Sequence, residues 1–301
     1  MKADSKLAKK IDAGEFIITA ECAPGATATG ATVEAALKFF NGKLAAVNFP
    51  DNSHGVAISS VAAAVTAIKL GAEPILQMVT RDRNRIALQS DLLGAASLGI
   101  KNVLCMTGYH QMLIGCPDSA NVFDVDSSQF IDLATRMAEN GVLADGTKID
   151  GQFSMLVGAV ANPFMRPLDL NLFRLGIKIE TGAKFIQTHA VFDVPAFGQW
   201  LDATRKEGLT KKAAILAGVF PLGSAAEARK LGDHYAEFRI PEMIIERLKK
   251  AGDDAAQKKE GIAICVETIK QLKALGGVRG IHLLSGGKES SVPEILSAAG
   301  L

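Results

Sequence analysis

The sequence lacks both an excess of charge of one sign and any long hydrophobic run. Its 301 residues include 33 Lys or Arg and 32 Asp or Glu, which gives a net charge of +1. A near-neutral chain without a polybasic block is poorly suited to nucleic acid or an anionic membrane surface as its main partner. No apolar run approaches the roughly 20 residues of a membrane-spanning helix, and the lysine-rich start has no apolar core typical of a signal peptide. We therefore expect a soluble, cytoplasmic protein without membrane insertion.

Cysteine is also scarce. The four cysteines, Cys22, Cys105, Cys116 and Cys265, form no C-x-x-C motif or other paired spacing. This pattern favours a reducing compartment and argues against a zinc or iron–sulfur site. We expect no bound metal.

What the sequence does contain is a regular alternation of short apolar runs with helical patterns. Strands are predicted at 16–22, 44–49, 75–79, 102–106, 153–161, 184–189, 213–220 and 280–284. Helices are predicted at 32–41, 56–70, from a cap at Asp82 to Gly99, at 127–140, 168–181, 194–207, 224–232, after Pro241, at 254–275 and at 291–299. Strand–helix–strand units of this length build parallel sheets, and eight strands match a (β/α)₈ TIM barrel. We predict one barrel domain over 1–301, with extra helices before the eighth strand and at the C-terminus. A doubly wound open sheet is the alternative, but no G-x-G-x-x-G follows the first strand.

The carboxyl ends of the predicted strands carry polar side chains, and in parallel barrels functional groups collect there. Glu21 lies in an apolar run, so burial would raise its pKa and keep it able to donate a proton near pH 7. An ion pair with a neighbouring Lys or Arg is the open alternative. Asn48, Gln77 and Thr107 end three successive strands and would line one side of a pocket, unless they only cap loops.

Two further stretches are candidates for binding. Asn171, Arg174 and Lys178 have helical spacing and share one face, which could be a solvated face or a ligand-binding one. Residues 108–125 form a long loop, and such loops are usually functional or disordered.

Several motifs resemble methylenetetrahydrofolate reductase, the flavin-dependent TIM-barrel enzyme of one-carbon metabolism. They are Asp82-Arg83-Asn84-Arg85, the segment from Leu98 to Asn102, Thr107-Gly108, and the E-x-x-P element formed by Glu21 and Pro24. The resemblance implies reduction of 5,10-methylenetetrahydrofolate to the 5-methyl form, or the reverse oxidation. It also implies a flavin, FAD in preference to FMN, and NAD(P)H or another hydride or electron donor as co-substrate.

The resemblance also assigns roles to single residues. Glu21 would be the general acid that protonates N10 of the folate, with Tyr109 and His189 as further catalytic positions. Flavin contacts would come from Asn48, Gln77, Thr107, Gly108, Tyr109, His110, Val160, Asn171, Arg174 and Lys178. Substrate contacts would come from Glu21, His189, Glu227, Leu231 and Lys288.

This chain departs from the family at several of these positions. Tyr109 stands where relatives have Asp, His189 where they have Gln, and Val160 where they have an aromatic residue. Glu227, Leu231 and Lys288 occupy positions where relatives have Gln, Phe and Arg, respectively. Two alternatives therefore remain: a same-fold reductase for another one-carbon pterin such as a methanopterin or with a different electron donor, and a barrel without catalysis that serves assembly or docking. We expect a one-carbon pterin as ligand, and a homo-oligomer or a subunit of a one-carbon-pathway complex.

Overall fold

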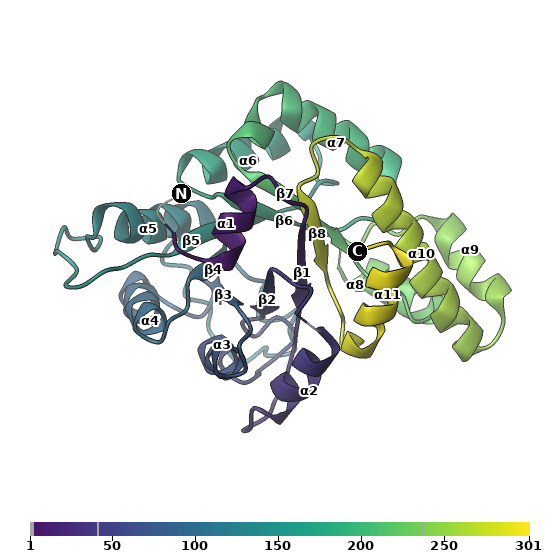
Figure 1. The fold of residues 1–301 in the computed structure, drawn as a ribbon, viewed down its shortest axis with the longest axis horizontal. Helices are drawn as coiled ribbons and strands as arrows, with labels where there is room; N and C mark the ends of the chain where they lie inside the picture. Colours follow the sequence, from purple (N-terminus) through teal and green to yellow (C-terminus); the bar gives the residue numbers. More distant parts are fainter. Residues whose placement is uncertain (1–2, 41, 236) are drawn as a thin grey trace.

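Eight parallel strands close into a barrel in which each strand pairs with the next along the chain and β8 pairs with β1 (Figure 1). The computed structural model describes residues 3–40, 42–235 and 237–301. The strands are β1 (Ile17–Glu21), β2 (Ala46–Phe49), β3 (Pro74–Val79), β4 (Asn102–Met106), β5 (Leu156–Ala161), β6 (Phe185–Ala190), β7 (Ala214–Val219) and β8 (Gly280–Leu283). The predicted TIM barrel is confirmed.

Helices surround the barrel and cover the outer faces of the strands (Figure 1). They are α2 (Ala31–Phe40), α3 (Ser60–Lys69), α4 (Arg85–Ser97), α5 (Ser127–Asn140), α6 (Leu168–Glu180) and α7 (Val194–Lys206), followed by the short η1 (Leu209–Lys211). Between β7 and β8 the chain forms α8 (Ala225–His234), α9 (Glu242–Ala251) and α10 (Asp254–Ala274), and it ends with η2 (Glu289–Ser291) and α11 (Val292–Ala298). The last residue of the helix predicted at 32–41 lies outside the described residues.

One helix was not predicted, and one local prediction, the cap of α4, was wrong. The lysine-rich start contains a helix, α1 (Lys6–Asp12), which is too short to show a clear apolar period. Its Leu7 and Ala8 pack against the apolar lower end of the barrel interior and close that end. The cap of α4 is Asn84, whose side chain accepts hydrogen bonds from two backbone N–H groups, and Asp82 is held instead by Arg81.

The barrel interior changes from apolar to polar along its axis. The lower layers are apolar and contain Ile17, Ala46, Ile75, Leu104, Leu156, Phe185, Ala214 and Leu216. Above them lie Thr19, Asn48, Gln187 and His282, which we call the polar layer; all four are buried and linked by hydrogen bonds. Side chains alternate between the two faces of a strand, so Glu21 and His189, two residues beyond Thr19 and Gln187, also point inward at the carboxyl end.

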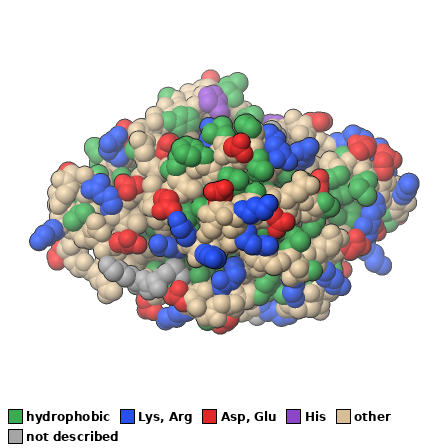
Figure 2. Space-filling view, turned by 90° about the horizontal axis from the view of Figure 1, so that it is seen from above, with side chains coloured by type: hydrophobic (Ala, Val, Ile, Leu, Met, Phe, Trp, Pro, Cys, Tyr) green, Lys and Arg blue, Asp and Glu red, His purple; other side chains and the backbone are tan. Residues whose placement is uncertain are grey.

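The outer surface carries both signs of charge. Figure 2 shows Lys and Arg side chains interspersed with Asp and Glu over one face of the molecule. Among the helices of the described residues, none is both long and apolar enough to cross a membrane.

Candidate active site

A cavity of about 460 Å³ opens at the carboxyl ends of the strands, and we call it the mouth cavity. Of the residues predicted from sequence, Glu21, Gln77, Thr107, Gly108, Tyr109, Val160, Lys178 and His189 line it. A second space of about 510 Å³, the side cavity, lies against α6 and the start of α5. It is lined by Asn171 and Arg174 and shares Thr107, Val160 and Lys178 with the mouth cavity, so the two spaces adjoin. Their volumes are in the range of small-molecule sites.

Glu21 lies at the end of β1 and is held by an amide rather than by a cation. Gln77 Nε2 donates a hydrogen bond of 3.1 Å to Glu21 Oε2, and no Lys or Arg of the described chain pairs with this carboxyl. Burial raises the pKa of Glu21 to about 7; the hydrogen bond from Gln77 opposes this rise, and the charge of Glu289 adds to it. A carboxyl with such a pKa can deliver a proton at neutral pH.

Tyr109 reaches from the loop after β4 across the barrel mouth. Its hydroxyl donates to the carboxylate of Glu237, and its ring packs on Tyr235 with the centroids 5.1 Å apart. Burial raises the pKa of Tyr109 above its ordinary value, and the Glu237 carboxylate raises it further. The phenol is therefore neutral at working pH and provides a hydrogen-bonding and stacking group, where an Asp would provide a negative charge.

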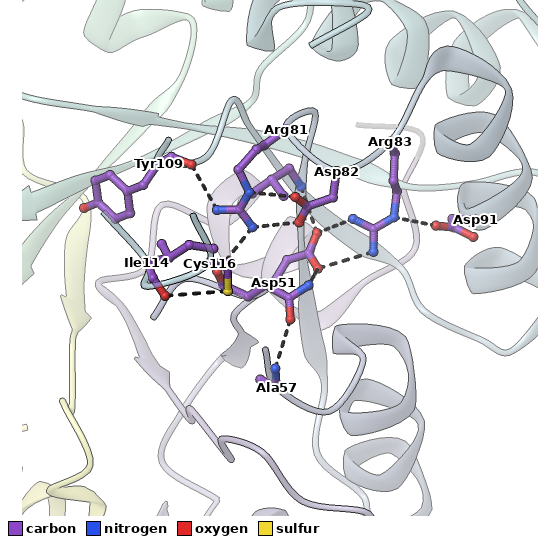
Figure 3. A network of polar contacts seen from close by, with 11 residues as sticks. Asp51, Ala57, Arg81, Asp82, Arg83, Asp91, Tyr109, Ile114 and Cys116 are labelled. Carbon is purple, nitrogen blue, oxygen red and sulfur yellow. Dashed lines mark hydrogen bonds and ion pairs between the residues drawn. The ribbon is translucent and has the colours of Figure 1, made fainter. Parts of the chain in front are cut away.

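Gly108 fixes the turn that presents Tyr109. Its φ is +86°, and a Cβ there would lie 3.0 Å from the Val79 side chain, so a larger residue would be strained. On the other side, the backbone oxygen of Tyr109 accepts a 3.0 Å hydrogen bond from Arg81 Nη1. Figure 3 shows the phenol ring directed away from this arginine.

Arginine side chains tie the loops after β2, β3 and β4 together (Figure 3). Arg81 is fully buried and pairs with Asp82 at 2.7 Å, and it also donates to the backbone oxygen of Asn52. Arg83 pairs with Asp51 at 2.6 Å, and Asp51 in turn accepts from the backbone N–H of Val79. Both guanidinium groups pair with carboxylates of this chain. They therefore stabilise the loops that carry residues of the mouth cavity.

His189 lies on an irregular part of β6. The pairing of β6 with β7 shifts between Gln187 and Ala190, and bulges of this kind often re-aim a side chain beside a site. The neighbouring strand β7 has Gly218 at this point. No larger residue fits there, because a Cβ would lie 2.3 Å from the backbone oxygen of Thr188. Burial lowers the pKa of His189, although the charge of Glu237 opposes this, so the imidazole is neutral near pH 7.

Lys178 lies at the junction of the two cavities. Its Nζ donates a 2.8 Å hydrogen bond to the backbone oxygen of Val160. Burial lowers the pKa of Lys178, and the nearby charge of Arg174 lowers it further. An anionic ligand group beside this amine would favour its charged form and so oppose both effects on the pKa.

Asn171 has a mainly structural environment although it touches the side cavity. Its Nδ2 donates to the backbone oxygens of Asn162 and Met165, and its Oδ1 accepts from Trp200. The amide therefore holds the loop after β5, which forms one wall of the side cavity.

Five of the predicted positions lie outside the walls of both cavities. The amide of Asn48 is used within the polar layer, and His110 turns back to the backbone of Met112. Lys288 pairs with Glu227 at 2.6 Å beside Phe220, so each charge neutralises the other. Leu231 packs in the hydrophobic cluster formed with Phe220 and Phe238. The direct contacts of these five residues with ligand stay predictions.

Other residues of the mouth cavity were not predicted from the sequence. His54, Gln187, Phe220, Phe238 and His282 also line it. Gln187 and His282 are polar positions inside apolar strands, and that pattern could have identified them. Phe238 comes from the segment between α8 and α9, and no sequence signal places that segment over the mouth. Among the described residues, no group of His, Cys, Asp and Glu side chains could hold a metal ion.

Comparison with known proteins gives one family and several distant relatives. A family model described as methylenetetrahydrofolate reductase matches residues 6–300. A Caenorhabditis elegans protein named "Probable methylenetetrahydrofolate reductase (NADPH)" is 25% identical over 258 residues, which cover 84% of this chain and 36% of the relative. "Methylenetetrahydrofolate reductase 1" of Schizosaccharomyces pombe is 27% identical over 135 residues, or 44% of this chain and 22% of the relative. The chain thus spans well under half the length of either relative.

Solved structures with the same fold include a protein of Clostridium thermocellum, which covers 98% of this chain and is itself covered to 98%. The TM-score is 0.68 and the sequence identity is 16%, so the similarity establishes the shared fold. That protein is described as uncharacterized and as binding two copies of 5-methyl-5,6,7,8-tetrahydrofolic acid.

Proposed function

The chain belongs to the methylenetetrahydrofolate reductase family, and on that premise we propose that it interconverts 5,10-methylenetetrahydrofolate and 5-methyltetrahydrofolate with a flavin as hydride carrier. The observation that carries the proposal is Glu21, a carboxyl with a pKa of about 7 at the floor of a cavity at the barrel mouth. Folate binding by the Clostridium thermocellum protein of the same fold supports the choice of ligand.

The residues of the two adjoining cavities fit a flavin. The mouth cavity offers Gln77, Thr107 and Gly108 to a planar ring, and the side cavity offers the cations Lys178 and Arg174 to phosphate. The additional length of the side cavity along α6 favours FAD over FMN. A bound flavin would supply the hydride that the methylene carbon needs, with NAD(P)H or another donor as co-substrate.

Glu21 supplies the proton. In the bridged substrate one carbon joins N5 and N10, and transfer of the Glu21 proton to N10 breaks the bond from that carbon to N10. The electron pair stays on N10, and an iminium cation forms at N5 that can accept hydride to become the methyl group. The carboxylate left on Glu21 keeps its hydrogen bond from Gln77, which favours the charged form.

Tyr109 and His189 have supporting roles in this scheme. Both are neutral near pH 7 and lie on the cavity wall, so they can hydrogen-bond the pterin without adding charge. The absence of a carboxylate at Tyr109 leaves the iminium cation less stabilised than in relatives with Asp. The carboxylate of Glu237 accepts the hydrogen bond of the Tyr109 hydroxyl.

Two tests address the proposal directly. Purified protein should show flavin absorption bands, and anaerobic mixing with 5-methyltetrahydrofolate and an artificial electron acceptor should produce the methylene form. Parallel assays with methyl-tetrahydromethanopterin decide the alternative pterin, and assays with different donors decide the electron source. Protein that binds no flavin and turns over neither pterin would contradict the proposal and favour a non-catalytic barrel acting in an oligomer or a one-carbon-pathway complex, the alternative suggested by Tyr109.

A further inference from the structure

The polar layer beneath Glu21 fixes the hydrogen bonding of one imidazole. Gln187 and Asn48 exchange two side-chain hydrogen bonds of 2.7 and 3.0 Å across the barrel. The same Gln187 Nε2 lies 3.1 Å from Thr19 Oγ1 and 3.3 Å from His282 Nδ1, and Thr19 Oγ1 lies 3.0 Å from Nδ1. His282 Nδ1 therefore lies within hydrogen-bond distance of two side chains of the same layer that belong to other strands.

This arrangement determines which nitrogen of His282 carries the proton. Gln187 Nε2 can only donate, and its two protons serve its two nearest acceptors, Asn48 Oδ1 at 3.0 Å and Thr19 Oγ1 at 3.1 Å. Thr19 Oγ1 thus accepts from Gln187, and we assign its own hydroxyl proton to the 3.0 Å contact with His282 Nδ1, which then carries no proton. Burial lowers the pKa of His282 to about 3, so the ring is neutral at working pH. A neutral imidazole has one N–H, and here it must be at Nε2.

Within the described part of the chain, the hydrogen bonds of His282 are made at Nδ1, and Nε2 is not one of the buried atoms that lack a partner. The residue lines the mouth cavity together with Glu21 and Gln187. A donor that faces a cavity forms its hydrogen bond with water or with a bound ligand.

We propose that His282 is a ligand-binding residue whose Nε2–H donates a hydrogen bond to a carbonyl oxygen or ring nitrogen of a heterocyclic amide in the mouth cavity. The pyrimidinone edges of pterins and of flavins both present such acceptors, so this inference rests on the proposed function and specifies how the cavity recognises its ligand. A neutral donor suits a neutral acceptor because it adds no charge beside Glu21. The contact should also be insensitive to pH across the neutral range, since the imidazole does not titrate there.

Two substitutions separate binding from a purely structural role. In His282→Asn the side-chain oxygen can take the place of Nδ1 and keep the bond from Thr19, but the donor toward the cavity is lost. In His282→Gln the longer side chain can place an amide nitrogen near the position of Nε2 and keep a donor. A ligand-binding role predicts that Gln preserves affinity, whereas a role only in the polar layer predicts that Asn does.

The experiment measures dissociation constants of the full chain and both variants for 5-methyltetrahydrofolate and, separately, for FAD. We expect His282→Asn to bind one of the two about tenfold more weakly, because one buried neutral hydrogen bond is lost, and His282→Gln to stay within about threefold. The ligand that shows the loss is the one that His282 contacts. The inference is overturned if His282→Asn binds both ligands like wild type, or if His282→Gln loses as much affinity. Wild type that binds neither ligand overturns the proposed function together with this inference.

A spectroscopic measurement tests the same point without ligand. Nitrogen-15 NMR of histidine-labelled protein, with the His282 signals identified by their loss in His282→Asn, should show a neutral ring protonated at Nε2 from pH 5 to 8. Reversal of both amides in the Asn48–Gln187 pair would instead place the proton on Nδ1 and turn Nε2 into an acceptor. A proton on Nδ1 would overturn the inference.

Discussion

Gln77 Nε2 lies 3.1 Å from Glu21 Oε2, which joins the carboxyl ends of β3 and β1 across the intervening strand β2. Two opposing effects meet at this contact. Burial favours the protonated acid, whereas the amide donor favours the carboxylate, and together they leave the pKa of Glu21 at about 7. The protonation state that the proposed reaction requires thus depends on burial, which raises the pKa, and on the opposing hydrogen bond between non-neighbouring strands.

Glu21→Gln should retain flavin and its reduction by a donor but lose turnover of the methylene pterin. Only the pterin half-reaction needs a proton at N10, and loss of one general acid costs about 10²- to 10⁴-fold in rate. Single-turnover mixing of reduced protein with the methylene substrate measures this step. Glu34→Gln, on an exposed part of α2, is the matched control and should react like wild type. A rate for Glu21→Gln within a few-fold of wild type would exclude Glu21 as the acid.

Gln77→Leu should shift the pH profile of the pterin half-reaction upward. The hydrogen bond from Gln77 lowers the pKa of Glu21, so its removal raises that pKa above about 7 and the active protonated form persists to higher pH. In wild type, the rate should fall as pH rises through about 7. A profile that stays in place, or moves to lower pH, would contradict the assignment of this limb to Glu21.

Glu21 should also make the stability of the fold depend on pH. Its pKa rises from an ordinary 4.5 to about 7 on folding, so the folded state binds the proton more tightly. The stabilising contribution is complete below pH 4.5 and is lost as pH rises through about 7. The free energy of unfolding of wild type, measured against Glu21→Gln by urea titration, should therefore decline over this interval. Parallel curves for the two proteins would mean that the carboxyl has an ordinary pKa in the folded state.

Lys178→Met should weaken flavin retention while the fold is kept. Loss of one charge-assisted contact costs roughly 1.5–3 kcal/mol, or about one to two decades in affinity. Flavin content after extensive dialysis measures the effect. Lys206→Met, at the exposed end of α7, removes the same charge away from both cavities and should retain flavin fully. Equal flavin content in the two variants would argue against a phosphate-holding role for Lys178.

Tyr109→Asp should lower the reduction potential of bound flavin by tens of millivolts. The neutral phenol would be replaced by a negative charge at the cavity wall, which disfavours build-up of negative charge on the reduced flavin; about 30 mV for a two-electron couple corresponds to roughly 1.4 kcal/mol. Redox titration compares wild type, Tyr109→Asp and the uncharged control Tyr109→Phe. An unchanged or higher potential in Tyr109→Asp would remove the electrostatic explanation and leave Tyr109 as a packing residue.

Arg81→Met should destabilise the fold strongly. Removal of this buried guanidinium leaves Asp82 and the backbone oxygens of Asn52 and Tyr109 without their donor, a loss of about 3 kcal/mol or more. Thermal or urea unfolding measures it. Arg85→Gln breaks an exposed pair with Asp124 and should leave the unfolding midpoint nearly unchanged. Similar midpoints for the two variants would show that the Arg81 contacts add little.

The site was only partly accessible from the sequence. The places of Glu21 and Gln77 near the ends of predicted strands were enough to expect them at the barrel mouth, because functional groups of parallel barrels collect at the carboxyl ends of the strands; His189 was assigned through the family resemblance. The helical period placed Asn171, Arg174 and Lys178 on one face of α6, but it could not distinguish the buried amide that holds a loop from the amine at the cavity junction. The roles assigned to these residues stay predictions.

The sequence by itself determined the barrel, because the order of strands and helices and the handed crossover between parallel strands leave few other folds. Only the tertiary structure decided the partners of the functional side chains. Tyr109 meets Glu237 and Lys288 meets Glu227 across separations of 128 and 61 residues. Closure of the barrel also brings Asn48 and Gln187 from opposite sides into one layer. Such pairs depend on the register of the strands and on the paths of the loops along the whole chain. No local sequence pattern specifies these.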